Sequence, residues 1–363
     1  MRVLVVNAGS SSLKLSVLEG GQVLAKRDLS ADRDGFDQDE LAAFLSDTEI
    51  DAVGHRVVHG GTEFTEPTVL DDDVLTALRH LTDLAPLHQP KSLAGIDAVT
   101  AARPELPTVV CFDTAFHATL SEVAYTYAIP AEWRSRWNVR RFGFHGLSHA
   151  YSSRRAAEIV EQPAEGLRVV VCHLGAGASL CAVADGRSVD TTMGFTPLEG
   201  LVMATRSGSV DPGLVLWLQE HGGLSAAQVS AALEHESGLL ALSGDADMRA
   251  LLLRAEQGDA AAVLAIDVYV HRLVAGVAAM TATLGGLDVL AFTGGVGENA
   301  SAVRAAAARK LAHLGVQLVS DLNERARGDA NISSSDDPVR TVVVAAREDL
   351  EIERGVHSAL PGT

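Results

Sequence analysis

Aromatic residues, cysteine and positive charge are all scarce in this chain of 363 residues. Phe, Trp and Tyr together make up 4% of it, so the interior must be filled by Val, Leu and Ala. Three cysteines, without the spacing of a metal site or a disulfide framework, are expected to be reduced core thiols: Cys111, Cys172 and Cys181. The formal charge of −18 argues against the basic surface that grips phosphate backbones, so no nucleic-acid partner is expected.

Long hydrophobic runs are lacking as well. The apolar run before Asn7 is too short for a signal peptide. Residues 260–284 form the most apolar helical pattern, but Asp267, His271 and Arg272 interrupt it. This pattern predicts a buried helix and no membrane span, so we expect a cytoplasmic protein without a membrane partner.

What the chain does contain is a repeat of its own beginning. Residues 2–23 read RVLVVNAGSSSLKLSVLEGGQV, and residues 168–189 read RVVVCHLGAGASLCAVADGRSV without a gap. Each copy has a β-branched run, a turn of glycine and small residues, and a second apolar run, which predicts a hairpin. Turns of this kind can hold a phosphate on backbone N–H groups. The repeat predicts two duplicated domains with a nucleotide between them, which suits the length of the chain.

Polar residues follow several expected strands. The run 108–112 is continuously apolar and ends at Asp113, as in a central strand that delivers a carboxylate at its C-terminal end. A second buried strand, 288–292, runs into TGGVGENA and a helix starting near Ala300, a setting typical of nucleotide sites. Further helices are expected near 73–82, 91–102, 211–222, 225–234 and 257–284, and a last strand at 341–344 precedes a final helix.

Several side chains have both a functional and a structural interpretation. Asn7, Ser10, Ser12 and Lys14 share the first turn and suit phosphoryl oxygens, or form only a polar hairpin tip. The strand residue Arg56 is either paired structurally or directed at an anion.

The loop residue Arg206 has no obvious helical partner, which favours an anion site. The histidines His145 and His149 are four residues apart, but the glycines around His145 indicate a loop residue that contacts an anion, and His149 is expected to be structural. Asp113 and Glu348 alone could simply cap helices, although Mg²⁺ favours such hard oxygen ligands.

Taken together, seven segments resemble the acetate kinase family. They are NAGSSSLK, GHRVVHGG, LAPLH, FDTAF, RRFGFHGLSH, MGFTPLEGLVMATRSGSVDPG and FTGGVGEN, in family order over nearly the whole chain. The resemblance implies an α/β protein of two duplicated ribonuclease H-like (actin-like ATPase) domains with a cleft, comprising 1–117 plus 351–363 and 118–350. It also implies reversible transfer of a phosphoryl group from ATP to acetate, giving acetyl phosphate and ADP, with Mg²⁺ (or Mn²⁺) and a homodimer.

The resemblance also implies roles for individual residues. Asp113, His145 and Arg206 would be catalytic, Asn7 and Glu348 would hold the metal, and Arg56 would bind the substrate carboxylate. Val58, Leu87, Phe144 and Pro197 would form the pocket for the methyl group. The nucleotide would be held by Ser10, Ser12, Lys14, His173, Leu174, Gly175, Ala176, Gly177, Asp247, Met248, Arg249, Gly295, Val296, Gly297, Glu298 and Asn299. Replacing Arg56 or Arg206 by Ala is expected to nearly abolish activity and leave the fold intact.

The chain departs from the family pattern at a few positions. Ala176 stands where the family usually has an asparagine, Arg347 lies beside Glu348, and Gln89 replaces another asparagine. These changes keep three alternatives open: a propionate or butyrate kinase, an enzyme that uses pyrophosphate or another nucleotide, and a nucleotide-binding sensor without turnover.

Overall fold

The computed structural model describes residues 1–8, 12–32, 35–84 and 89–361. The chain forms two compact units. Unit 1 comprises residues 1–118, 144–151 and 347–363, and unit 2 comprises residues 119–143 and 152–346. Residues 144–151 and 347–350 therefore pack with unit 1, whereas the sequence-based boundaries assign them to the second domain.

Unit 1 is built on a mixed sheet in the order β4-β3-β2-β1-β5-β7-β6. Strands β1, β5 and β7 are parallel, and the neighbours outside them pair antiparallel. The strands are β1 (Val3–Ala8), β2 (Ser12–Glu19), β3 (Gln22–Asp32), β4 (Gly35–Phe36), β5 (Ala52–Val57), β6 (Thr68–Val69) and β7 (Thr108–Phe112).

Unit 2 repeats this arrangement in the order β10-β9-β8-β11-β13-β12, with the corresponding strand directions. Its strands are β8 (Arg168–Leu174), β9 (Ala178–Ala184), β10 (Arg187–Thr191), β11 (Val289–Thr293), β12 (Ala330–Asn331) and β13 (Arg340–Val343). The first three are the counterparts of β1, β2 and β3. Both predicted hairpins, and the prediction of two duplicated α/β domains, are confirmed.

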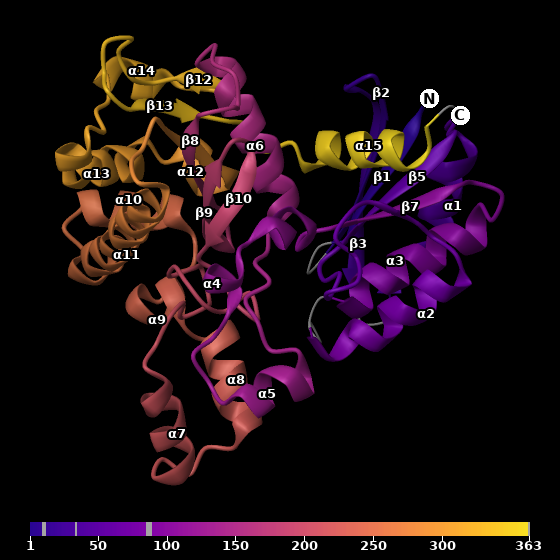
Figure 1. Cartoon of the computed structure of the whole chain (residues 1–363), viewed down its shortest axis with the longest axis horizontal. Coiled ribbons are helices and arrows are strands. Elements are labelled where there is room, and N and C mark those ends of the chain that lie inside the picture. The colour runs from indigo at the N-terminus through magenta and orange to yellow at the C-terminus, as the bar shows by residue number, and fades with distance from the viewer. Residues whose placement is uncertain (9–11, 33–34, 85–88, 362–363) are drawn as a thin grey trace. The chain divides into compact units, whose positions relative to one another are not determined.

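Helices cover both faces of the sheet in unit 1, as alternation along β1 requires. Val3 and Val5 pack with α15 on one face, and Leu4 and Val6 pack with α1 and α3 on the other. Figure 1 shows α15 crossing β1, β5 and β7 opposite these helices. The elements are α1 (Gln38–Ser46), α2 (Asp72–His80), η1 (Leu81–Leu84), α3 (Gln89–Ala102), η2 (Ala115–Thr119) and α15 (Glu348–Ala359). Helix α6 (Gly146–Ile159) contributes its first residues to unit 1 and the rest to unit 2.

Two glycines let α15 lie unusually close to this sheet. A Cβ added to Gly54 on β5 would lie 2.6 Å from Ile352, and one added to Gly355 would lie 2.7 Å from the Cys111 sulfur. Any larger side chain would push the helix outward. The close contact fixes the position of the helix N-terminus, where Glu348 lies.

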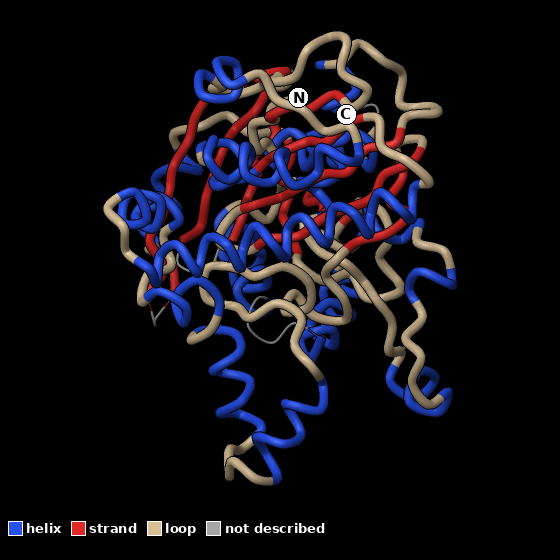
Figure 2. Tube along the Cα trace, turned by 90° about the vertical axis from the view of Figure 1, so that its left-hand side faces the viewer, coloured by secondary structure: helices blue, strands red, loops and turns tan. Residues whose placement is uncertain are grey.

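The helices expected in unit 2 are present, and several short helices are found in addition. Figure 2 shows helices lying across the strands. Helices α4, α5, α9, α10, α12 and α14 were not predicted, and α12 occupies the segment that was expected to be a glycine-rich turn. The helices are α4 (Glu122–Tyr125), α5 (Ala131–Trp137), α7 (Pro212–Glu220), α8 (Ala226–His235), α9 (Gly238–Ser243), α10 (Met248–Glu256), α11 (Ala260–Leu284), α12 (Gly294–Asn299), α13 (Ser301–Leu311), η3 (Ala312–Leu314) and α14 (Ser320–Arg325).

The long helix α11 is buried along one face only. Its buried residues recur every three or four positions, as in Ala262, Ala265 and Tyr269, while Val263 and Leu264 are exposed. By length and composition α11 could cross a membrane, and 33% of its most apolar window is buried within the chain. The predicted burial of this helix is therefore correct for one face of α11, and its other face is exposed.

The three cysteines are free and fully buried in their strands, as expected. Burial raises the pKa of the Cys111 thiol and of the Cys181 thiol to about 12. Such thiols stay protonated at neutral pH and act as small core residues.

His55 predicts a dependence of stability on pH. It lies on β5 between Val6 and Val110, it is 1% exposed, and its Nε2 atom has no hydrogen-bond partner. Burial lowers its pKa from 6.5 to about 3. The unfolded chain therefore binds more protons below pH 6.5, so stability falls as the pH drops from there toward 3. The contribution of His55 should fall by about 2 kcal/mol between pH 7.5 and 5.

Urea unfolding at pH 7.5 and pH 5 would measure this change in the free energy of unfolding. His55→Leu should show a smaller pH dependence than the wild type, and His80→Asn, at an exposed position, should not. An unchanged pH dependence in His55→Leu would refute the assignment.

Candidate active site

Three polar side chains meet at the carboxyl edge of the parallel strands in unit 1. Asn7 lies near the end of β1, Arg56 lies near the end of β5, and Asp113 directly follows β7. Parallel strands place these ends at one edge of the sheet, where ligands bind in α/β folds. Glu348, the first residue of α15, joins them from the helix packed on the same sheet.

Hydrogen bonds connect all four side chains. Arg56 donates through Nε and Nη2 to the two oxygens of Asp113, at 3.0 and 2.6 Å. Its Nη1 donates to the Asn7 Oδ1 atom at 3.1 Å, and Asn7 Nδ2 donates to Glu348 Oε2 at 3.3 Å. Glu348 Oε2 also lies 3.9 Å from Arg56 Nε. Arg56 is therefore paired structurally and at the same time belongs to a charged cluster.

Burial dominates the electrostatics of this cluster. Burial raises the pKa of Asp113, and the charge and hydrogen bonds of Arg56 oppose the rise. For Arg56, burial works against the charged form, but the charges of Asp113 and Glu348 outweigh it and raise its pKa. Two carboxylates face one guanidinium, so the cluster can accept a further cation.

The donor set suits Mg²⁺. This ion is usually held by one or two carboxylates with water and substrate phosphates, and Glu348 with the Asn7 amide oxygen offers such hard ligands. Among the described residues no group of three or more His, Cys, Asp or Glu could form an all-protein metal cage. These residues therefore suit a metal ion that keeps several water ligands, and not a structural metal bound by protein side chains alone.

His145 is held close to Asp113 by the backbone. It has a φ of 57° and precedes α6, whose first residue, Gly146, donates its N–H to the Asp113 carbonyl at 2.8 Å. A Cβ at Gly146 would lie 2.1 Å from that carbonyl oxygen, so only glycine fits. His145 is a loop residue, as predicted, and His149 lies inside α6, fully buried.

Some of the predicted substrate residues also lie in unit 1. Phe144 is buried with its ring against that of His59, at a centroid distance of 5.5 Å, and Val58 is buried directly after β5. The exposed Lys14 is paired with Asn7 across β1 and β2, so both side chains share a face of the sheet. Ser10, Leu87 and the side chain of Ser12 lie outside the described residues.

Unit 2 contains a cavity of about 400 Å³ lined by many of the predicted nucleotide residues. The predicted residues among its walls are Gly175, Ala176, Asp247, Met248, Arg249, Gly295, Val296 and Asn299. His173, Leu174, Gly177, Gly297 and Glu298 are not part of the lining. Sequence reasoning missed the apolar remainder of the wall, which consists of Ala204, Leu239, Ala246, Leu252, Tyr269 and Ala300.

The turn at Ala176 offers less backbone than the sequence suggested. The N–H of Gly175 donates to the Gly177 carbonyl at 2.9 Å, within the turn itself. The carbonyl of Ala176 accepts the N–H of Ala204 at 3.1 Å. The N–H of Gly175 is therefore used within the turn.

Arg304 supports the cavity wall and was not singled out from the sequence. It is 1% exposed and donates to the carbonyls of Gly297 and Glu298, each at 2.8 Å. It also donates to the side chain and the backbone carbonyl of Asn323. An arginine in an alanine-rich helix normally indicates the solvent-exposed face of that helix. The sequence around Arg304 therefore does not predict that this side chain is buried.

Two residues behave differently from what their sequence neighbours suggest. The guanidinium of Arg347 donates to the Asp349 carboxylate at 2.8 and 3.0 Å. Arg347 therefore forms its ion pair with Asp349 and not with Glu348. Gln89 is buried and donates to the carbonyl of His59, which fixes the chain after Val58.

Arg206 and Pro197 lie in unit 2, on the segment between β10 and α7. Burial lowers the pKa of Arg206, although the charge of Glu234 raises it. The Arg206 carbonyl accepts the N–H of Met203 at 3.1 Å, and neighbouring Thr205 donates to the Glu234 carbonyl. Arg206 thus lies on a well-tied loop, two residues beyond Ala204 of the cavity wall.

Comparisons with known proteins agree with the motifs. A model of the acetokinase family matches residues 37–354. An acetate kinase of Deinococcus radiodurans is 45% identical, covering 98% of this chain and 97% of that protein. The crystal structure of Porphyromonas gingivalis acetate kinase has a TM-score of 0.91, 36% identity and 99% coverage of both chains. A propionate kinase from Francisella tularensis has a TM-score of 0.91 and 37% identity, covering 98% of both chains.

The buried pair predicts that Arg56 matters for stability as well as for any activity. Arg56→Ala leaves the Asp113 carboxylate, which is 1% exposed, without its bidentate partner. Loss of one partner of a buried pair costs about 3–5 kcal/mol. The expectation that this change leaves the fold intact is therefore revised.

Urea unfolding should show Arg56→Ala to be strongly destabilised and Arg56→Ala/Asp113→Asn to recover part of the loss. Arg79→Ala, from an exposed pair with Asp97, is the control and should change little. Equal effects of Arg56→Ala and Arg79→Ala would show that the buried pair has no special weight.

Proposed function

The chain belongs to the acetokinase family, and we propose that it transfers the terminal phosphoryl group of ATP reversibly to acetate, giving acetyl phosphate and ADP. The observation that carries the proposal is the cluster of Asn7, Arg56, Asp113 and Glu348 at a strand-end edge. The cavity of unit 2, lined by the predicted nucleotide residues, supports ATP as the donor.

Phosphoryl transfer to acetate requires that the two substrates be positioned, more than it requires a general base. An acetate oxygen, already ionised at neutral pH, forms a bond to the terminal phosphorus while the bond to the bridging oxygen of ADP breaks. Two anions must therefore be brought together in line, and fixed cations make this possible. In our proposal Arg56 binds the acetate carboxylate, held in place by its bonds to Asp113 and Asn7.

His145 and Arg206 would donate to the equatorial oxygens of the transferring group, and Asp113 would act as the catalytic carboxylate. Mg²⁺, held by Asn7 and Glu348, would neutralise charge on the phosphates when bound. Lys14, on the same sheet face as Asn7, would contact the phosphates.

The size of the acyl pocket decides between acetate and its homologues. Val58, Leu87, Phe144 and Pro197 would surround the methyl group, and one methylene is worth only ~1–3 kcal/mol of discrimination. The structural similarity to a propionate kinase keeps propionate as the second candidate substrate.

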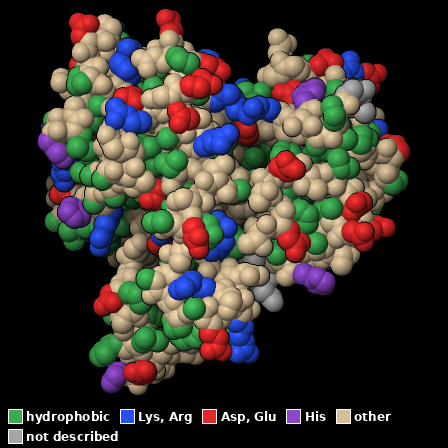
Figure 3. All heavy atoms as spheres, in the orientation of Figure 1, with side chains coloured by type: hydrophobic (Ala, Val, Ile, Leu, Met, Phe, Trp, Pro, Cys, Tyr) green, Lys and Arg blue, Asp and Glu red, His purple; other side chains and the backbone are tan. Residues whose placement is uncertain are grey.

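We further propose a cytoplasmic homodimer. Large apolar side chains are exposed on α7, where Leu214, Leu216 and Trp217 are each about half accessible. Figure 3 shows hydrophobic side chains reaching the surface in the region of α7 and α8. Such surfaces commonly mark contacts with another protein.

A hydroxamate assay with acetate, ATP and Mg²⁺ tests the activity directly. We expect product above a control without enzyme, and a decrease of ~10³–10⁵ in rate for Arg206→Ala. Arg155→Ala, which removes an exposed ion pair with Asp329 in the same unit, should retain activity. Replacing ATP by GTP or pyrophosphate identifies the donor. Absence of product with every donor would favour the nucleotide-binding sensor.

Gly295 offers a test of the nucleotide cavity. A Cβ at this cavity-lining residue meets no heavy atom within 4 Å, so a larger side chain fits without strain. Gly295→Leu should therefore occupy part of the cavity and raise the KM for ATP at least ~10-fold, with little change in thermal stability. Ala226→Leu, on the exposed start of α8, is the control. An unchanged KM for ATP in Gly295→Leu would place the nucleotide elsewhere.

A further inference from the structure

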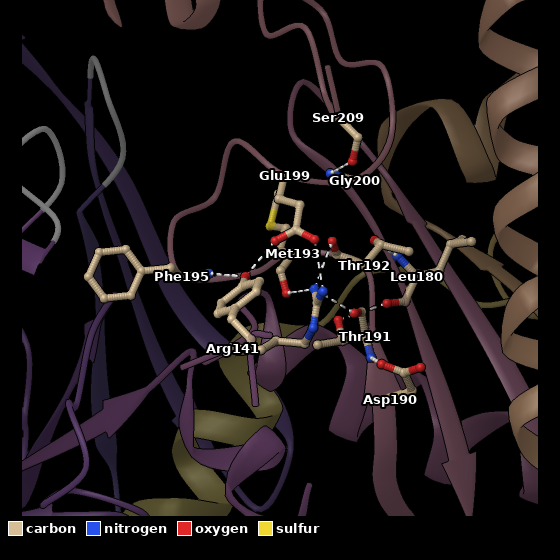
Figure 4. Close-up of polar contacts among 11 residues, drawn as sticks. Arg141, Leu180, Asp190, Thr191, Thr192, Met193, Phe195, Glu199, Gly200 and Ser209 are labelled. Atoms are coloured by element: carbon tan, nitrogen blue, oxygen red, sulfur yellow. Dashed lines mark hydrogen bonds and ion pairs between the residues drawn. The ribbon is translucent and has the colours of Figure 1, made fainter. Parts of the chain in front are cut away.

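Arg141, to which no role has been assigned above, holds the loop that follows β10 in unit 2. Its Nη1 atom lies 3.1, 3.3 and 2.9 Å from the carbonyl oxygens of Thr191, Thr192 and Met193. Its Nη2 atom donates to Glu199 Oε1 at 2.8 Å. Figure 4 shows the guanidinium directed at these oxygens. One side chain therefore connects the end of β10 with a residue further along the following loop.

Tyr127 completes the network. Its hydroxyl donates to the second oxygen of Glu199 at 2.5 Å and accepts the backbone N–H of Phe195 at 3.0 Å. The guanidinium carbon of Arg141 lies 5.6 Å from the centre of the Tyr127 ring. Burial, followed by the hydrogen bond to Glu199, raises the pKa of Tyr127, so the hydroxyl keeps its proton. The two terminal nitrogens of Arg141, both oxygens of Glu199 and the hydroxyl of Tyr127 are thus used in holding the loop.

The loop has little freedom to move around this network. A Cβ at Gly194 would lie 1.8 Å from Glu199 Oε2 and 2.1 Å from the Tyr127 hydroxyl. The Gly194 carbonyl accepts the N–H groups of Phe142 and Gly143, at 3.0 and 3.2 Å. The segment next to Arg141 in the chain is therefore bound to the same loop, and rigid packing of this kind transmits small displacements.

Pro197 lies between the two anchored residues of the loop, Phe195 and Glu199. The next stretch is closed by Gly200 and Ser209, which exchange two hydrogen bonds of 3.0 Å each, and Arg206 lies within it. The position of the proline, and of the arginine after it, therefore depends on how firmly Glu199 is held. Displacements of about 1 Å at a reacting site can cost ~100-fold in rate.

We propose that Arg141, Glu199 and Tyr127 are positioning residues that fix Pro197 as a wall of the acyl pocket and so set the discrimination between acetate and longer carboxylates. The inference rests on the proposed function, which places Pro197 beside the substrate methyl group. Loosening the network would leave Pro197 less firmly held, which harms the small substrate more than the larger one.

Tyr127→Phe is the most selective test, because it removes one hydroxyl and keeps the ring. We expect the ratio of kcat/KM for acetate to that for propionate to fall at least ~5-fold, within the ~10–200-fold range that one methylene provides. The KM for ATP should stay within ~2-fold. Hydrogen exchange at the Phe195 amide should become ~10-fold faster, because its acceptor is lost. Glu199→Gln should change the ratio in the same direction.

Tyr125→Phe is the matched control, since Tyr125 ends α4 two residues before Tyr127 and its ring lies 3.7 Å from the guanidinium carbon of Arg140. Arg168→Lys, which weakens the bidentate pair with Asp288 in the same unit, controls for general destabilisation. Both should keep the substrate ratio of the wild type. Arg141→Lys should retain more of the ratio than Arg141→Ala, because the charge facing Glu199 is kept.

The positioning role of the network and the proposed function can be refuted by different results. Equal losses for acetate and propionate in Tyr127→Phe and Glu199→Gln would overturn it, as would unchanged exchange at Phe195. A wild-type protein without carboxylate kinase activity would refute the proposed function instead, which the exchange measurement does not depend on.

Discussion

The buried ion pair between Arg56 and Asp113 is the interaction on which the candidate site depends. A charged guanidinium is tolerable on a central strand only because a carboxylate at the end of the next strand takes two of its hydrogen bonds. A third donor of Arg56 orients Asn7, and Asn7 in turn contacts Glu348. The pair thus gives three strands and one helix a common polar centre, and it keeps the guanidinium directed where an anion could bind.

The two units share a strand order but not this chemistry. By strand register, the positions of Asn7, Arg56 and Asp113 correspond to His173, Thr293 and Ala346 in unit 2. No second arginine and carboxylate stand at these positions, and unit 2 instead has a cavity with several glycines and alanines in its wall. Duplication therefore supplied two equivalent sheet edges. One edge carries the charged groups, and the other leaves room for a large ligand.

Sequence patterns predicted much of this arrangement, because the responsible signals are local. The repeated hairpins, the strand before Asp113 and the loop position of His145 follow from apolar runs and glycines within a few residues. What escaped prediction depends on contacts across long sequence distances. The burial of Arg304, the pairing of Arg347 with Asp349 and the network of Arg141 each require knowledge of which carbonyls or carboxylates surround a guanidinium. The sequence around an arginine does not show whether its side chain faces water or the core.

The packing of α15 has a consequence for how the chain folds. Residues from both ends of the described chain belong to one unit, and Met1, Ala359 and Leu360 pack against the same hydrophobic cluster (Figure 1). During synthesis, the strand face formed by Val3, Val5 and their neighbours lacks its α15 cover until that helix leaves the ribosome. Unit 2 has by then been completed, so the first unit to be made is the last that can finish folding. A product that ends before α15 therefore lacks Glu348 and the sheet cover that this helix supplies.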